Sequence, residues 1–162
     1  MTIDAWTNFF IAQCGASAAL LGLLFVSVSL NLSRILAYPQ LPGRALLAML
    51  LLLTILIIAL LMLVPGQPIA ANAIEILAPG LLLCGAAVIA KVRDLRRSVA
   101  DWRSYFIGDL AFLAAATLPY LVAGVLLLMG SPAALYWLAA AMILSILKSV
   151  ADAWVLLVEI NR

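Results

Sequence analysis

The sequence predicts an all-α integral membrane protein, a bundle of five transmembrane helices. Of its 162 residues 68% are hydrophobic and the mean hydropathy is +1.26, whereas a soluble domain is only about half apolar. Five runs of about 20 apolar residues follow one another with short connections, and each is long enough to cross the hydrocarbon core of a bilayer. No remaining stretch suits a separate soluble core. We therefore expect residues 1–162 to form a single transmembrane domain.

Breaks in the apolar pattern give the helix boundaries. The residues that interrupt it are Pro39, Pro42-Gly43, Pro65-Gly66-Gln67-Pro68 and Gly130-Ser131-Pro132. We predict helices at about 8–35, 45–64, 71–90, 105–129 and 132–160. The segment 91–104 carries charges of both signs at helical spacing, which predicts a basic inner loop with a short interfacial helix. This loop either sets the orientation of the chain or docks a cytoplasmic partner.

Two spans have distinctive compositions. Thr54 is the only polar residue of the second span, which is therefore predicted to face lipid on the outside of the bundle. The third span is the weakest, because Asn72 and Glu75 lie near its start and Pro79-Gly80 is expected to kink it. A chain of four spans with a re-entrant third segment is the alternative.

The positive charges predict the orientation. In a five-span chain, eight of the nine Lys and Arg residues fall on the side that holds the loops after the first and third spans and the C-terminus. Because basic loops stay in the cytoplasm, the N-terminus is predicted to lie outside and the C-terminus inside. The ninth basic residue, Lys148, lies deep in the fifth span.

Charged and polar residues share one face of the fifth span. At 100° per residue, an arc of about 100° holds Ser145, Lys148, Ser149, Asp152 and Glu159. A lysine within the membrane costs at least about 2.5–3.5 kcal/mol on insertion scales, so it requires a partner or water. Lys148 precedes Asp152 by four residues, which is the less favourable order for a pair within one helix. We therefore expect a partner on another helix.

The first span carries two faces that avoid lipid. One face holds the polar residues Gln13, Ser17, Ser27, Asn31 and Arg34. The opposite face holds the small residues Gly15, Ala18, Ala19 and Gly22. Small residues four apart let helix backbones approach closely. We infer that this span is the central helix, with its small face packed on a neighbour and its polar face turned to the fifth span or to a subunit contact.

Asp109, about one turn inside the fourth span, is placed to meet Arg34, Lys148 or the basic loop. The predicted site is an intramembrane polar seam that comprises Lys148, Asp152, Ser145, Ser149, Glu159, Asn31, Ser27, Arg34 and Asp109. Such a seam is either a structural network that fixes helix register or a water-lined route that binds or gates a solute.

Several classes of function find no support in the sequence. There is no histidine, and Cys14 and Cys84 lie apart in apolar spans, so neither a metal site nor a cofactor is predicted. No nucleophile with a base and no phosphate-binding glycine loop is present, which argues against an enzyme. The net charge of +2 is too small to indicate nucleic-acid binding.

The segment from Gly15 to Asn31, followed by Leu41-Pro-Gly-Arg-Ala45, resembles small uncharacterised bacterial multi-spanning membrane proteins that open with Gly-x-x-Ala-Ala-Leu-x-Gly-Leu-Phe-Val. The resemblance covers about a quarter of the chain. It implies a multi-pass protein of the bacterial inner membrane and assigns no functional residue.

Two functions remain open at this point. The first is an oligomeric channel or transporter for an ion or small solute that uses the polar seam. The second is a structural or regulatory protein that binds another membrane protein, with the Lys148 and Asp152 network purely structural. In both, the expected partners are the lipid bilayer and further copies of the chain, because few helices are available in one protomer to enclose a pathway.

Overall fold

The computed structural model describes residues 3–38, 41–97 and 103–160, and it is helical almost throughout this part of the chain. Its elements are the 3-10 turn η1 (Ile3–Trp6) and the helices α1 (Thr7–Leu30), α2 (Leu32–Ala37), α3 (Leu41–Leu61), α4 (Ile69–Arg97), α5 (Arg103–Leu128) and α6 (Ala134–Ile160). Five of the described helices, all except α2, are long and apolar enough to span a membrane. The predicted all-helical class with five spans is confirmed.

Three boundaries differ from the prediction. The first span is interrupted at Asn31, whose φ of −110° and ψ of 17° depart from α-helical geometry, so α2 is a separate short helix. The third span is one continuous helix that includes Pro79, so the re-entrant alternative is wrong. Residues 91–97 extend α4 instead of belonging to a loop, and residues 98–102 lie outside the described part of the chain.

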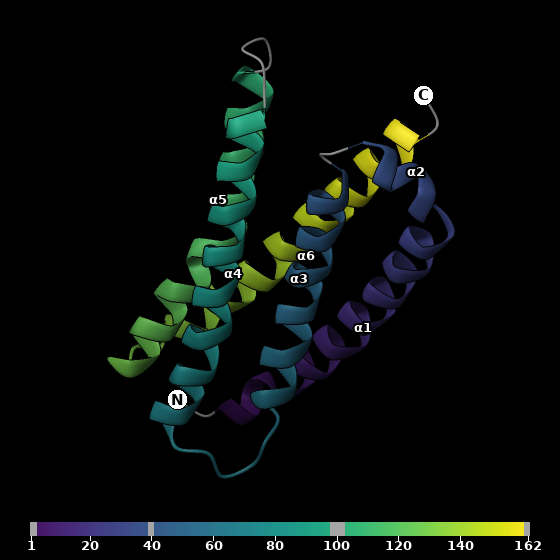
Figure 1. The fold of residues 1–162 in the computed structure, drawn as a ribbon. Helices are drawn as coiled ribbons and strands as arrows, with labels where there is room; N and C mark the ends of the chain where they lie inside the picture. Colours follow the sequence, from purple (N-terminus) through teal and green to yellow (C-terminus); the bar gives the residue numbers. More distant parts are fainter. Residues whose placement is uncertain (1–2, 39–40, 98–102, 161–162) are drawn as a thin grey trace.

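Helix α3 is the centre of the bundle, and α1 lies at its edge (Figure 1). Within the described chain α3 packs against α1, α4 and α6, whereas α1 packs chiefly against α3. Both sequence predictions are therefore wrong: the second span is not an outer helix and the first is not central. In a bilayer an apolar side chain suits lipid and protein equally, so composition alone does not separate the two environments.

Small side chains explain why α3 occupies the centre. Ala45, Ala48 and Ala59 are 3%, 0% and 0% exposed, and alanine allows neighbouring backbones to approach closely. Helix α6 crosses the bundle obliquely, from the end where α1 begins to the end where α2 lies (Figure 1). The beginning of α1 and the end of α6 thus lie at opposite ends of the bundle, as an odd number of spans requires.

Glycines bring α4 and α5 into close contact. A Cβ added at Gly124 would lie 2.4 Å from Cγ of Leu77, and one added at Gly80 would lie 3.0 Å from Cβ of Tyr120. At Gly85, on the exposed side of α4, an added Cβ would meet no heavy atom within 4 Å. Each of the two helices therefore has a glycine on the face that it turns to the other, Gly80 on α4 and Gly124 on α5.

Gly124→Ala should destabilise the protein by about 1–3 kcal/mol, because the methyl group overpacks the contact with Leu77. Gly85→Ala is the matched control: it should be neutral or stabilising by up to about 1 kcal/mol, since alanine is the better helix former. Thermal unfolding in detergent micelles measures both variants. Equal transition temperatures for the two would contradict the close α4–α5 packing.

Candidate functional site

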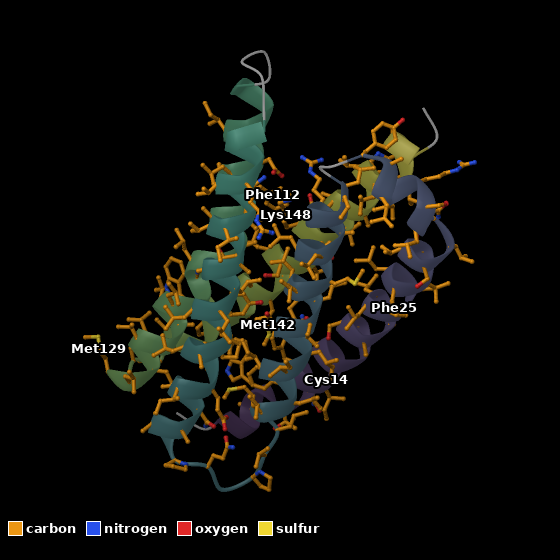
Figure 2. All side chains as sticks on the ribbon, viewed as in Figure 1. Cys14, Phe25, Phe112, Met129, Met142 and Lys148 are labelled. Atoms are coloured by element: carbon orange, nitrogen blue, oxygen red, sulfur yellow. The ribbon has the colours of Figure 1, made fainter. Side chains whose placement is uncertain are left out.

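Lys148 lies inside the bundle and is bound by two carboxylates. Its ammonium donates to both carboxylate oxygens of Asp152, one turn further along α6, and lies 2.9 Å from Oδ1 of Asp109 on α5. Phe112 lies beside Lys148 (Figure 2), and the distance from Nζ to the centroid of its ring is 5.9 Å. This distance is short enough for a cation–π contact. The lysine therefore has both a partner in its own helix and the partner on another helix that the sequence required.

Asp109 joins three cations from three different helices. In addition to Lys148 on α6, its Oδ2 accepts a hydrogen bond from Lys91 on α4 and lies 3.8 Å from Nη2 of Arg44 on α3. We call these four residues, together with Asp152, the charge cluster. Four of the five spans contribute to it, and α1 does not.

Exposure increases outward along the charge cluster. The side chains of Lys148 and Asp152 are 2% and 4% exposed, those of Lys91 and Asp109 are 11% and 17%, and that of Arg44 is 32%. Arg44, Lys91 and Asp109 all lie within a few residues of the end of their spans. Because α6 is tilted, Lys148 meets them although it lies ten residues from Val158, where its own span ends. The cluster thus reaches from the interior towards the predicted inner end of the bundle.

Two serines of α6 attach it to its neighbours. The Ser149 hydroxyl donates to the carbonyl oxygen of Ala48 on α3 at 3.0 Å, and the Ser145 hydroxyl donates to the carbonyl oxygen of Ala116 on α5 at 3.0 Å. Tyr120, which is fully buried, donates its hydroxyl to Oγ of Ser145 at 3.2 Å. These bonds satisfy every hydroxyl on this face of α6, so the polar face serves helix packing along its described length.

The structure brings together five of the nine residues of the predicted polar seam: Ser145, Lys148, Ser149, Asp152 and Asp109. It does not bring the first span to them. Asn31 donates its Nδ2 to the carbonyl oxygen of Ser27 at 3.0 Å, which is a local bond at the break between α1 and α2, and Arg34 is exposed on α2. The predicted seam between the first and fifth spans is therefore wrong. The side chain of Glu159 lies outside the described residues.

The small residues of the first span are also placed differently from the prediction. Gly15, Ala18, Ala19 and Gly22 are all exposed in the single chain. Ala18 and Gly22 border an apolar groove of about 530 Å³, whose other wall is formed by leucines of α3. The small face does not pack on a neighbouring helix within the chain.

The sequence predicted that Asp109 meets Arg34, Lys148 or the basic loop, and the contact with Lys91 of that predicted loop is confirmed. Arg44 was not predicted as a member of the site, although a usable signal was present. Arg44 and Lys91 adjoin the inner ends of the predicted spans 45–64 and 71–90, and Asp109 lies about one turn inside the inner end of 105–129, which places all three at a similar depth. A carboxylate at the depth of two cations predicts pairing between helices.

The charge cluster has the chemistry of ion pairing. Neither Ser145 nor Ser149 directs its hydroxyl at Lys148, since both donate to backbone carbonyl oxygens. Within the described residues, no three His, Cys, Asp or Glu side chains gather as a metal site. The cluster holds three cations and two anions, and its pairs cross the contacts among α3, α4, α5 and α6.

Comparisons with protein-family models, with curated proteins and with solved structures found no match to this chain. Its class therefore comes from the structure itself. Five apolar helices of 21 to 25 residues with their paired charges turned inward define a multi-pass helical membrane protein.

Lys148→Met should destabilise the protein by about 3–5 kcal/mol, because it leaves the buried Asp152 carboxylate without its cation. The double variant Lys148→Met plus Asp152→Leu should recover much of this loss, since no unpaired charge remains and Asp109 keeps Lys91 and Arg44. Denaturant unfolding in micelles measures both. A double variant less stable than the single one would contradict a paired, dry site.

Proposed function

We propose that the protein is a membrane-embedded interaction protein that associates with further copies of itself, and that the charge cluster has a structural role. The observation that carries this proposal is the pairing of Lys148, which is 2% exposed and bound to two carboxylates. A binding or gating lysine needs an open face for its solute or for water. Here the ammonium is occupied by protein groups.

The location of the pockets supports the same function. One pocket of the described chain is the apolar groove beside α1, and another lies between the start of α1 and the loop after α3. Neither has a residue of the charge cluster in its wall. Lys148 and Asp152 lie within packed protein, whereas the groove opens beside α1 and α3.

The small face of α1, with Gly15, Ala18, Ala19 and Gly22, is the surface that we propose for self-association. A Cβ added at Gly15 or Gly22 would meet no heavy atom of the chain within 4 Å. Glycine in a helix costs about 1 kcal/mol relative to alanine, and no contact within this protomer makes use of it. A second α1 presents the same small residues, so two copies related by a two-fold axis would approach closely and bury each other's grooves.

The proposed orientation has the N-terminus outside and the C-terminus inside a bacterial inner membrane. The support is the segregation of basic residues: Arg34, Arg44, Lys91 and Arg93 belong to the end of the bundle at which α6 terminates. Positive loops remain on the cytoplasmic side during insertion. We also infer that the protein is not an enzyme; the support is that the ions of the charge cluster are paired with one another.

Transport of an ion or small solute is the second candidate function. The observation that favours transport is that side-chain exposure increases from Lys148 to Arg44. Arg44 is 32% exposed and links the buried charges to one end of the bundle. An oligomer would be needed to complete a route past Lys148 to the other end.

Purified protein reconstituted in liposomes separates the two functions. We expect no flux of Na⁺, K⁺, Cl⁻ or protons above that of empty liposomes, because the ammonium and carboxylates are paired. A flux that is present with the natural sequence and lost in Lys148→Met plus Asp152→Leu would overturn the structural role and establish transport.

Gly22→Leu should shift the protein from oligomer to monomer, because the larger side chain fills the small face and keeps two α1 helices apart. The control is Gly85→Leu, at an exposed glycine of α4 that also has no heavy atom within 4 Å of an added Cβ. Multi-angle light scattering of the full chain in detergent gives the protein mass. A monomeric natural protein, or equal masses for the two variants, would refute the α1 interface.

A further inference from the structure

A second polar site lies at the end of the bundle opposite the charge cluster. There a pocket of about 270 Å³ is enclosed by Thr7 at the start of α1, by residues 62–67 after α3, and by Asn72 in the first turn of α4. Gly66 makes the sharp turn of this wall with a φ of +75°, a conformation that favours glycine. The loop between α3 and α4 thus forms one wall of the pocket.

Three buried oxygen atoms at this end have no hydrogen-bond partner in the described chain: Oε1 of Gln67, Oδ1 of Asn72 and Oε2 of Glu75. The other carboxylate oxygen of Glu75 accepts a bond from Nε2 of Gln67 at 2.9 Å, so Glu75 is tied to the pocket wall. Asn72 is itself only 4% exposed. Leaving a buried acceptor unsatisfied costs about 1–3 kcal/mol. Gln67 and Asn72 line the same pocket and Gln67 bonds to Glu75, so a common donor or cation would satisfy these acceptors.

Among the described residues, no lysine or arginine forms an ion pair with Glu75. The sequence has no Lys or Arg before Arg34, between residues 45 and 90, or between 104 and 147. The described lysines and arginines lie towards the opposite end of the bundle, where the charge cluster with Lys148 and Asp109 is located. No described lysine or arginine therefore balances the charge of Glu75, and a cation from solution is able to do so.

We propose that Gln67, Asn72 and Glu75 form a binding site for a monovalent hard cation, with Na⁺ as its model ligand. Carboxylate and amide carbonyl oxygens are the ligands that hard cations take in proteins. One carboxylate balances one positive charge, whereas calcium sites gain affinity from several carboxylates, so a single glutamate matches a monovalent ion better than Ca²⁺. The site is independent of the proposed self-association, because it lies at the loop after α3 and uses none of the small residues of α1.

Thermal unfolding of the full-length protein in detergent tests the site, with NaCl compared to choline chloride at equal ionic strength. Because a ligand that binds only the folded state stabilises it, the transition temperature should rise with Na⁺ and not with choline. Glu75→Gln should require at least about tenfold more Na⁺ for the same rise, as expected when a charged ligand is replaced by a neutral one. Glu159→Gln, which changes the other glutamate at the far end of α6, should behave as the natural protein does.

Radioactive ²²Na⁺ binding to the natural protein provides a measurement that does not depend on the folding of a variant. Saturable binding that choline does not displace, and that Ca²⁺ displaces less well than unlabelled Na⁺ does, is the expected result. Asn72→Asp adds a second carboxylate and should shift the preference towards Ca²⁺. No saturable binding, or equal Na⁺ dependence in Glu75→Gln and Glu159→Gln, would overturn the proposal and leave a pocket that holds water only.

Discussion

The contact between Lys148 and Asp109 is the interaction on which the arrangement of this bundle depends. A lysine ten residues inside the end of its span cannot remain unpaired in hydrocarbon. The 2.9 Å ion pair with Asp109 fixes where α6 crosses α5. Since Asp109 also accepts from Lys91 and lies near Arg44, the same carboxylate links α5 to α3 and α4 as well. The tilt of α6 follows, because a parallel α6 would leave Lys148 deeper than its partners.

Much of the fold was predictable from the sequence because its causes are local. The five spans follow from apolar length, and the turns follow from residues such as Gly66 and Gly130, which adopt positive φ at the ends of α3 and α5. The spatial order of the helices was not predictable in the same way. Composition placed α3 outside, although it is central, because lipid and protein interior solvate an apolar helix equally well. The break at Asn31 was also missed, since that sequence has neither proline nor glycine.

The candidate site was predicted in part for the same reason. Ser145, Lys148, Ser149 and Asp152 share a face of one helix, and helical periodicity reveals this directly. Which helix faces them is a property of tertiary packing. The polar arc of the first span predicted that this span faces the fifth. In the structure Asn31 bonds to the carbonyl oxygen of Ser27 and Arg34 is exposed. Lys91 and Arg44 are the further partners of Asp109. Their depth along the spans reveals them, whereas their positions on a helical wheel do not.

The two ends of the bundle differ in the chemistry of their polar groups. At one end positive charge is in excess and is held by two carboxylates, whereas at the other end oxygen acceptors are in excess around Glu75. Between them α1 offers a face that the chain itself does not use. This combination is consistent with a protein that is rigid in its interior and makes its contacts at its surface.

A double-mutant cycle between Lys148 and Asp109 tests the central claim most directly. Denaturant unfolding in micelles would be measured for the natural protein, Lys148→Met, Asp109→Leu and the double variant. If this contact organises the bundle, the coupling free energy should reach about 2–3 kcal/mol, the upper range for residues of one charged network. A coupling close to zero, with the two single effects simply adding, would show that the contact does not hold α5 and α6 together.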